Sequence, residues 1–260
     1  MDKGNCSSLT KVFLLGITVN MNVLLFTMFL VVYLTILLTN VGMIILIRMD
    51  PQVHTPMYFF LSHLSFSDLS YSTAIGTEML VDSLSKSKSI HFLGCALQFF
   101  IFCIFIDAEC VLLAVMAFNR YKAISNPLLF VVDMFNKVCY QLLAGIYTVA
   151  LADTLTHTTP TFHLYFCGSK EINHFFCDIP PVLVLSCSDT RINMLLMFTV
   201  LGFIELSTIP GVLISYGYII SSVLKIRCVE GRFKAFSTCT SHLTDVEDIF
   251  QKVKTKMWLK

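Results

Sequence analysis

Charged residues are scarce in this sequence. Only 13% of its 260 residues are Asp, Glu, Lys or Arg, and 56% are hydrophobic. Soluble domains carry about 25% charged residues, so the composition predicts a protein whose main solvent is a lipid bilayer. The net charge is only +1, whereas proteins that bind nucleic acid usually carry an excess of basic residues. The charge therefore argues against a nucleic-acid partner.

Several chemical patterns are also missing. The ten cysteines include no Cys-x-x-Cys pair, which disfavours a zinc site built with His163 or His174 relative to disulfides. We find no nucleophile–base set, so an enzyme is the least favoured class. Repeated halves and rings of polar pore residues are missing too, which argues against a transporter or channel.

Long apolar runs are present in number. Each is long enough for the roughly 20 residues that a span needs, and they occupy residues 23–47, 57–80, 92–118, 138–160 and 194–224. We expect no cleavable signal peptide, because the first run would itself direct insertion. If the N-terminus lies outside, the segments on the inner side of the membrane carry more Lys and Arg than the segments on the outer side. This asymmetry favours an external N-terminus.

The third run ends in the most distinctive stretch of the chain, MAFNRYKAISNP at residues 116–127. An apolar helix that ends in Asn-Arg-Tyr before a proline-broken loop is typical of a span meeting water; a snorkelling anchor is the alternative interpretation of the arginine. From Cys95 to Arg120 a helix rises about 37 Å at ~1.5 Å per residue, enough to cross a bilayer. Helical spacing places these residues on one face: Cys95, Phe102, Ile106, Glu109, Leu113, Met116 and Arg120.

Polar side chains inside the predicted spans need partners. Asn40 should face another helix, because an amide is costly in hydrocarbon. Asp68 is a candidate functional acid, with a protonated, hydrogen-bonded structural acid as the alternative. Asp107 lies off the common face of the third span and can face either a ligand cavity or a neighbouring helix. For His157 a hydrogen-bonded structural role is the favoured interpretation.

Three motifs resemble one family. MAFNRYKAISNP resembles the MAYDRYVAICNP motif of the olfactory receptors, a branch of the rhodopsin-like G-protein-coupled receptors. HTPMYFFLSHLSFSDL (residues 54–69) and KAFSTCTSHL (residues 234–243) resemble two further family motifs. The resemblance covers residues 5–244. It implies an all-α, rhodopsin-like helical bundle, of whose seven spans five are recognisable here.

The resemblance also implies a function. An odorant receptor would bind small hydrophobic odorants and signal through a stimulatory G protein, as a multi-pass protein of the plasma membrane with its N-terminus outside. The ligand-pocket candidates are Phe102, Cys103, Ile106, Asp107 and Glu205. For the first three, ordinary helix packing is the alternative, and for Glu205 an interhelical hydrogen bond. The G-protein-facing candidates are Asn119, Arg120, Tyr121 and Tyr216.

An ion site and two disulfides follow from the same resemblance. Asn40, Asp68 and Glu109 form the implied polar core, where two nearby carboxylates either share a cation or one of them keeps its proton. We favour a sodium ion and expect no other metal or cofactor. The implied disulfides are Cys95–Cys177 and Cys167–Cys187, a pairing that spacing alone leaves open. Asn5, in Asn5-Cys6-Ser7, fits a glycosylation acceptor.

The family pattern stops near the end of the chain. We divide the chain into an extracellular N-terminus (1–22), five spans (23–224), a third inner loop with the start of span six (225–244) and a charged tail (245–260). The tail carries seven charges, which would cost about 17 kcal/mol at ~2.5 kcal/mol each in mid-membrane. Its apolar residues recur at helical spacing, which predicts an amphipathic C-terminal helix.

We therefore expect spans six and seven to be missing, through an internal deletion or through a frameshifted or mispredicted end. Activation in the family moves span six, so signalling should be impaired. The alternative is a nonsignalling truncated membrane protein that is retained in the endoplasmic reticulum or pairs with other receptors.

Overall fold

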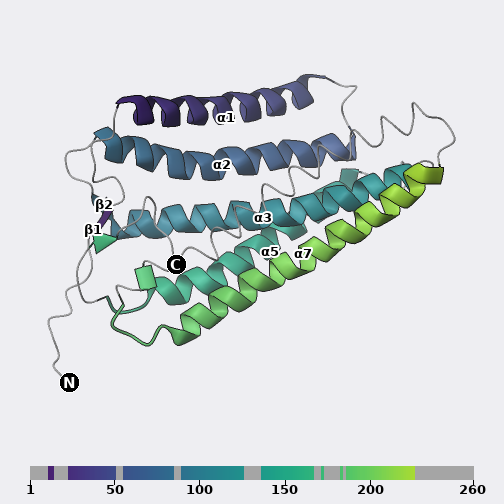
Figure 1. The fold of residues 1–260 in the computed structure, drawn as a ribbon. Helices are drawn as coiled ribbons and strands as arrows, with labels where there is room; N and C mark the ends of the chain where they lie inside the picture. Colours follow the sequence, from purple (N-terminus) through teal and green to yellow (C-terminus); the bar gives the residue numbers. More distant parts are fainter. Residues whose placement is uncertain are drawn as a thin grey trace.

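Five long helices make up most of the described chain (Figure 1). The computed structural model describes residues 11–14, 23–50, 55–84, 89–125, 136–166, 171–172, 182–183 and 186–225. The helices are α1 (Val23–Met49), α2 (Pro56–Leu84), α3 (Phe92–Ser125), α5 (Asn136–Phe162) and α7 (Arg191–Lys225). Each coincides within a few residues with a predicted span, so the all-α helical bundle is confirmed. The largest difference is α3, which continues past the apolar run through Arg120 to Ser125.

The helices are arranged around α3. It packs against α2, α5 and α7, whereas α1 packs chiefly on α2. In Figure 1, α1, α2 and α3 lie side by side, and α5 and α7 run along the other side of α3. Successive helices alternate in direction, so α1, α3 and α7 begin at the same end of the bundle. This alternation is the up-and-down arrangement expected when a chain crosses a bilayer repeatedly.

The exposed surface of the bundle is apolar. Within the described residues, four helical stretches are long and apolar enough to cross a membrane: Phe26–Met49, Phe92–Ser125, Lys137–Phe162 and Arg191–Ser222. On α1, Leu38 is 69% exposed, and on α7, Phe203 is 73% exposed. Exposed apolar surface of this extent matches a lipid surrounding rather than water. Helix α2, with 29 residues, carries more Ser and more acidic residues than any of the other four helices.

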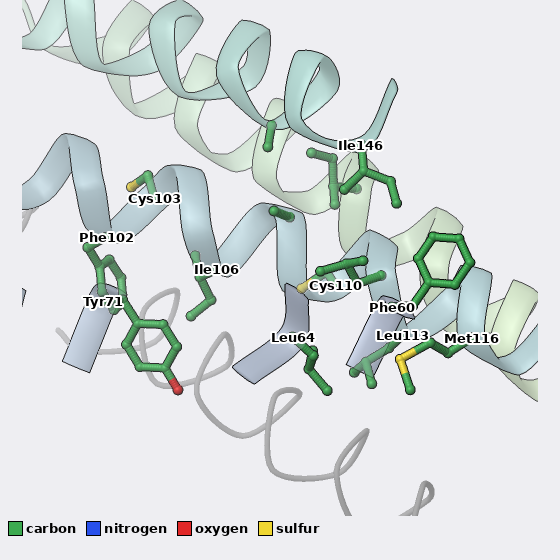
Figure 2. Close-up of a cluster of buried hydrophobic side chains, with 14 of the residues drawn as sticks. Phe60, Leu64, Tyr71, Phe102, Cys103, Ile106, Cys110, Leu113, Met116 and Ile146 are labelled. Carbon is green, nitrogen blue, oxygen red and sulfur yellow. The ribbon is translucent and has the colours of Figure 1, made fainter. Parts of the chain in front are cut away.

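The core lies where α2, α3 and α5 meet. Figure 2 shows Phe60 and Leu64 of α2 beside Leu113 and Met116 of α3, with Ile146 contributed by α5. The predicted face of α3 is buried from Cys95 to Met116. Other faces of α3 are buried as well, since Phe99, Ala108 and Leu112 are also inside. Helix α3 is therefore a central rod enclosed by its neighbours.

A small sheet at one end of the bundle was not predicted. Strand β1 (Lys11–Leu14) pairs antiparallel with β2 (Ser89–His91) and parallel with β3 (Glu171–Ile172). Strands β1 and β2 lie at the end where α3 begins (Figure 1). The sheet joins three segments that are distant in the sequence. These are the N-terminal segment, the connection between α2 and α3, and the segment that follows α5. Residues 226–260, including the predicted amphipathic tail, lie outside the described part of the chain.

Candidate functional site

The N-terminal half of α3 holds four of the five predicted ligand-pocket residues. Phe102, Cys103, Ile106 and Asp107 are all buried. The ring of Phe102 meets the ring of Tyr71 of α2 edge-on, with their centroids 6.1 Å apart. All four side chains therefore lie among packed helices rather than against lipid. Glu205 belongs to α7, and its side chain lies outside the described ones.

Asp107 faces the neighbouring helix α5. Its Oδ2 accepts a hydrogen bond from Thr154 Oγ1 at 3.4 Å, and both side chains are buried. The Asp107 carboxylate therefore lies at the α3–α5 contact, and a role in a ligand cavity stays a prediction.

A buried polar band continues along α5 beyond this contact. It consists of Asp153, Thr154, His157, Thr158 and Thr161. His157 Nδ1 lies 3.7 Å from Asp153 Oδ2, and the His157 ring meets the ring of Phe99 of α3 edge-on at 6.0 Å. The band thus presents hydroxyl, carboxylate and imidazole groups next to the apolar side chains of α3. Such groups can hydrogen-bond either to the neighbouring helix or to the polar end of a small ligand.

Asp68 of α2 has a side-chain partner on its own helix that was not predicted. The Tyr71 hydroxyl donates a hydrogen bond to Asp68 Oδ1 at 2.6 Å. The signal was present in the sequence, because residues three apart on a helix are neighbours. Asn40 is half-buried, and its Nδ2 donates to Ile36 O at 3.0 Å. This bond uses one of the two N–H groups of the Asn40 amide. The expectation that Asn40 faces another helix stays a prediction.

The polar-core residues come from three helices. Asp68 is half-buried in α2 and Glu109 is fully buried in α3, while Asn40 lies in α1. Among the described residues, no three His, Cys, Asp or Glu side chains are grouped closely enough to hold a metal ion. A cation here would therefore depend on hydroxyl, amide and backbone oxygens in addition to Asp68 and Glu109.

The C-terminal parts of α3 and α7 bring together most of the G-protein-facing candidates. Tyr216 of α7 is buried and packs in a cluster with Ala117 of α3, and Tyr121 lies against this cluster. The ring centroids of Tyr121 and Tyr218 are 5.3 Å apart. Asn119 is also buried, and Arg120 is half-buried. The small side chain of Ala117 permits this close contact, although Ala117 was not among the predicted site residues.

The cysteines separate into two groups. Cys103, Cys110 and Cys139 are buried within helices, as expected of packing residues. Cys95, at the start of α3, is buried and disulfide-bonded. Its predicted partner Cys177 lies outside the described residues, as do Cys167 and Asn5. The pairings Cys95–Cys177 and Cys167–Cys187 therefore remain predictions.

Known proteins resemble this chain over nearly its whole length. The family profile described as "Olfactory receptor" matches residues 29–253. Olfactory receptor 5W2 of Homo sapiens is 66% identical over 262 residues, which cover 100% of this chain and 84% of that receptor. Olfactory receptor 5AR1 is 52% identical in Homo sapiens and 53% identical in Mus musculus, each over 248 residues that cover 95% of this chain and 80% of the relative.

These matches agree with the three sequence motifs and with the apolar helices that surround α3. Olfactory receptors are G-protein-coupled receptors and not enzymes, so the expectation of a nonenzymatic, multi-pass membrane protein is confirmed. The chain belongs to the olfactory receptor family.

Proposed function

We propose that this chain binds small hydrophobic odorants among the helices that pack on the outer half of α3, and that its signal passes to a stimulatory G protein. The observation that carries the proposal is the enclosure of α3. The apolar surface formed by Phe102, Cys103 and Ile106 is buried, and the neighbouring Asp107 contacts Thr154 in the polar band of α5. Ligand sites are mostly apolar with a few convergent polar groups, and this surface has that composition.

The polar band suggests which odorants are favoured. Asp107 with Thr154, and His157 nearby, offer hydrogen-bonding groups beside the apolar surface. We propose Glu205 as a further polar contact. Odorants with an apolar body and one hydrogen-bonding group should therefore bind better than pure hydrocarbons of the same size, because a buried polar group left without a partner is costly.

We further propose a sodium ion in the polar core. Asp68 is the only acidic residue in the stretch 57–77 of α2, and Glu109 is buried on the facing helix. An acid buried in a membrane bundle needs a partner, a proton or a cation. In this proposal Asn40 supports the site from α1, and Tyr71 already supplies one hydrogen bond to Asp68.

The two ends of α3 give the proposed orientation. Cys95 would lie at the outer surface, tethered to Cys177, with Cys167–Cys187 within the same loop and a glycan on Asn5. The G protein would approach the opposite end, where Tyr121 and Tyr216 meet at the α3–α7 contact and Asn119 and Arg120 lie in the same part of α3. The plasma membrane is the expected site of action.

A second candidate function rests on the charged segment 245–260. A polypeptide made of these 260 residues alone would carry seven charges where the family resemblance requires a sixth span. We propose that such a polypeptide signals poorly. It would instead remain in the endoplasmic reticulum or pair with other receptors as a nonsignalling protein.

The two functions separate in one cell experiment. The 260-residue chain is expressed beside a chimera in which residues after 244 are replaced by the corresponding end of olfactory receptor 5W2. Surface staining and odorant-evoked cyclic AMP are measured with a broad panel of volatile compounds. We expect the chimera to reach the surface and respond, and the 260-residue chain to respond weakly or not at all. A silent chimera with normal surface staining would contradict the proposed receptor function.

A further inference from the structure

A groove lies on the surface of the bundle between α3 and α5. Its volume is about 390 Å³. Both helices line it, with Val111 and Val115 from α3 and Val138, Gln141, Leu142, Gly145, Ile146 and Val149 from α5. All of these residues except Gln141 are apolar, and the Val149 side chain is 51% exposed. The groove is therefore an apolar surface that faces the bilayer, separate from the proposed odorant pocket.

The wall that α3 contributes ends in a cation. Val111, Val115, Phe118 and Lys122 recur at i, i+4, i+7 and i+11, so they lie on one face of the helix. The Phe118 ring is 46% exposed, and Lys122 Nζ lies 5.9 Å from its centre. The ammonium group of Lys122 is thus folded back along this face toward the groove.

Helix α5 contributes a second cation. Lys137 is exposed, directly precedes Val138 and lies one turn before Gln141. Helices α3 and α5 run in opposite directions, so the end of α3 and the start of α5 lie at the same end of the bundle (Figure 1). Lys122 and Lys137 therefore lie toward the same end of the groove, one on each helix.

The length of the groove indicates its occupant. From Val138 to Val149, α5 rises about 16 Å at ~1.5 Å per residue. One leaflet of a bilayer has a hydrocarbon depth of about 15 Å, half of the whole core. The groove therefore follows one acyl chain from the headgroup region to the middle of the bilayer. Because the groove is open to its surroundings, a lipid can enter it sideways.

We propose that this groove binds one anionic phospholipid, with its headgroup at Lys122 and Lys137 and an acyl chain between α3 and α5. A zwitterionic phospholipid has the same tails but no net charge, so the two lysines favour the anionic lipid. The Gln141 amide can donate a hydrogen bond to the phosphate or to an ester carbonyl. The proposed orientation places this end of α3 at the cytoplasmic leaflet, where anionic lipids are concentrated.

Photolabelling of the full chain in phosphatidylcholine nanodiscs tests this proposal, and it requires neither an odorant nor a G protein. Two probes carry the same diazirine in an acyl chain, one with a phosphatidylserine and one with a phosphatidylcholine headgroup, and labelled peptides are mapped by mass spectrometry. At equal mole fraction the serine probe should label residues 111–122 and 137–149 about tenfold more, since each lysine contributes about fivefold. Both probes should label the exposed residues 28–46 of α1 equally.

Substitutions separate the headgroup site from the tail site. The double variant Lys122→Gln with Lys137→Gln should lose the preference for the serine probe, whereas Arg48→Gln, at the same end of the bundle on α1, should keep it. Gly145→Leu should reduce groove labelling by both probes. Gly42→Leu is its matched control, because nothing lies within 4 Å of a Cβ atom at either glycine.

Circular dichroism and the melting temperature verify that each variant folds. If the double lysine variant does not fold, the comparison of the two probes in the unaltered chain decides the question alone. Any of four results would overturn the proposal: equal groove labelling by both probes, a serine preference that survives in the folded double variant, unchanged groove labelling in folded Gly145→Leu, and groove labelling that disappears when each nanodisc holds two copies of the chain. The last result would assign the groove to a second copy.

Discussion

Tyr71 and Asp68 are joined by a hydrogen bond of 2.6 Å between the tyrosine hydroxyl and the Oδ1 atom of the carboxylate, one turn apart on α2. The same tyrosine ring meets Phe102 of α3 edge-on. The polar core on α2 and the apolar surface on α3 therefore share one side chain. A change at Tyr71 should consequently affect both the stability of the bundle and the proposed ligand pocket.

Tyr71→Phe removes the hydroxyl and keeps the ring. The free energy of unfolding should fall by about 1 kcal/mol, since hydrogen bonds to carboxylates are worth somewhat more than the modest average found in membrane helices. Thermal unfolding of the purified chain in detergent measures the change. Tyr218→Phe is the matched control, because Tyr218 is 56% exposed. Equal effects of both substitutions would show that the Tyr71 hydroxyl contributes nothing specific.

A sodium ion at Asp68 should make stability depend on the cation in the buffer. The melting temperature should be higher in sodium chloride than in choline chloride at the same ionic strength, because a ligand that binds only the folded state stabilises it. Asp68→Asn should abolish this difference. Asp50→Asn, at the exposed end of α1, should preserve it. A sodium effect that survives in Asp68→Asn would place the ion elsewhere.

Gly76→Ala tests the α1–α2 contact. The added Cβ would lie 2.6 Å from the Tyr33 ring, and overpacking of this kind costs about 1–3 kcal/mol. Gly42→Ala and Gly145→Ala are matched controls, because nothing lies within 4 Å of a Cβ at either position. The double variant Gly76→Ala with Tyr33→Ala should be less destabilised than the sum of the two single variants. Additive losses in that cycle would mean that the two residues do not interact.

Ala117→Leu tests the α3–α7 contact near the C-terminal ends of the two helices. Ala117 is fully buried against Val212, Tyr216 and Ile219, so a larger side chain should force the helices apart and cost about 1–3 kcal/mol. Odorant-evoked cyclic AMP in the chimera described above should fall as well. Ala144→Leu, on the exposed surface of α5, is the control and should be neutral. Wild-type stability in Ala117→Leu would show that α3 and α7 are not in close contact there.

The sequence predicted the helices well because the hydrocarbon imposes its thickness on every span. All five helices begin or end within a few residues of an apolar run. The exceptions have physical causes. Helix α3 extends to Ser125 because the backbone hydrogen bonds of a helix can continue past the last apolar side chain of the run. The sheet with strand order β2–β1–β3 was missed because its strands are two to four residues long and pair across distant segments.

Side-chain partners were harder to predict than spans. Asp107 could be placed off the main face of α3, but only the packing of α5 identifies Thr154 as its partner. Gly76 gave no signal in the sequence, because its role depends on where α1 sets the Tyr33 ring. Local pairs are different: Asp68 with Tyr71 could have been recognised from helical spacing alone.

The placement of the two ends of α3 on opposite sides of the bilayer is tested most directly by mapping the chain in microsomes. The glycan at Asn5 is detected by a glycosidase-sensitive mass shift that Asn5→Gln removes, and an epitope inserted after Pro127 is probed with protease. We predict a glycan in the lumen and an epitope that protease cleaves from the cytosolic side of intact microsomes. A glycosylated chain whose epitope is cleaved only after the membrane is opened would contradict this topology.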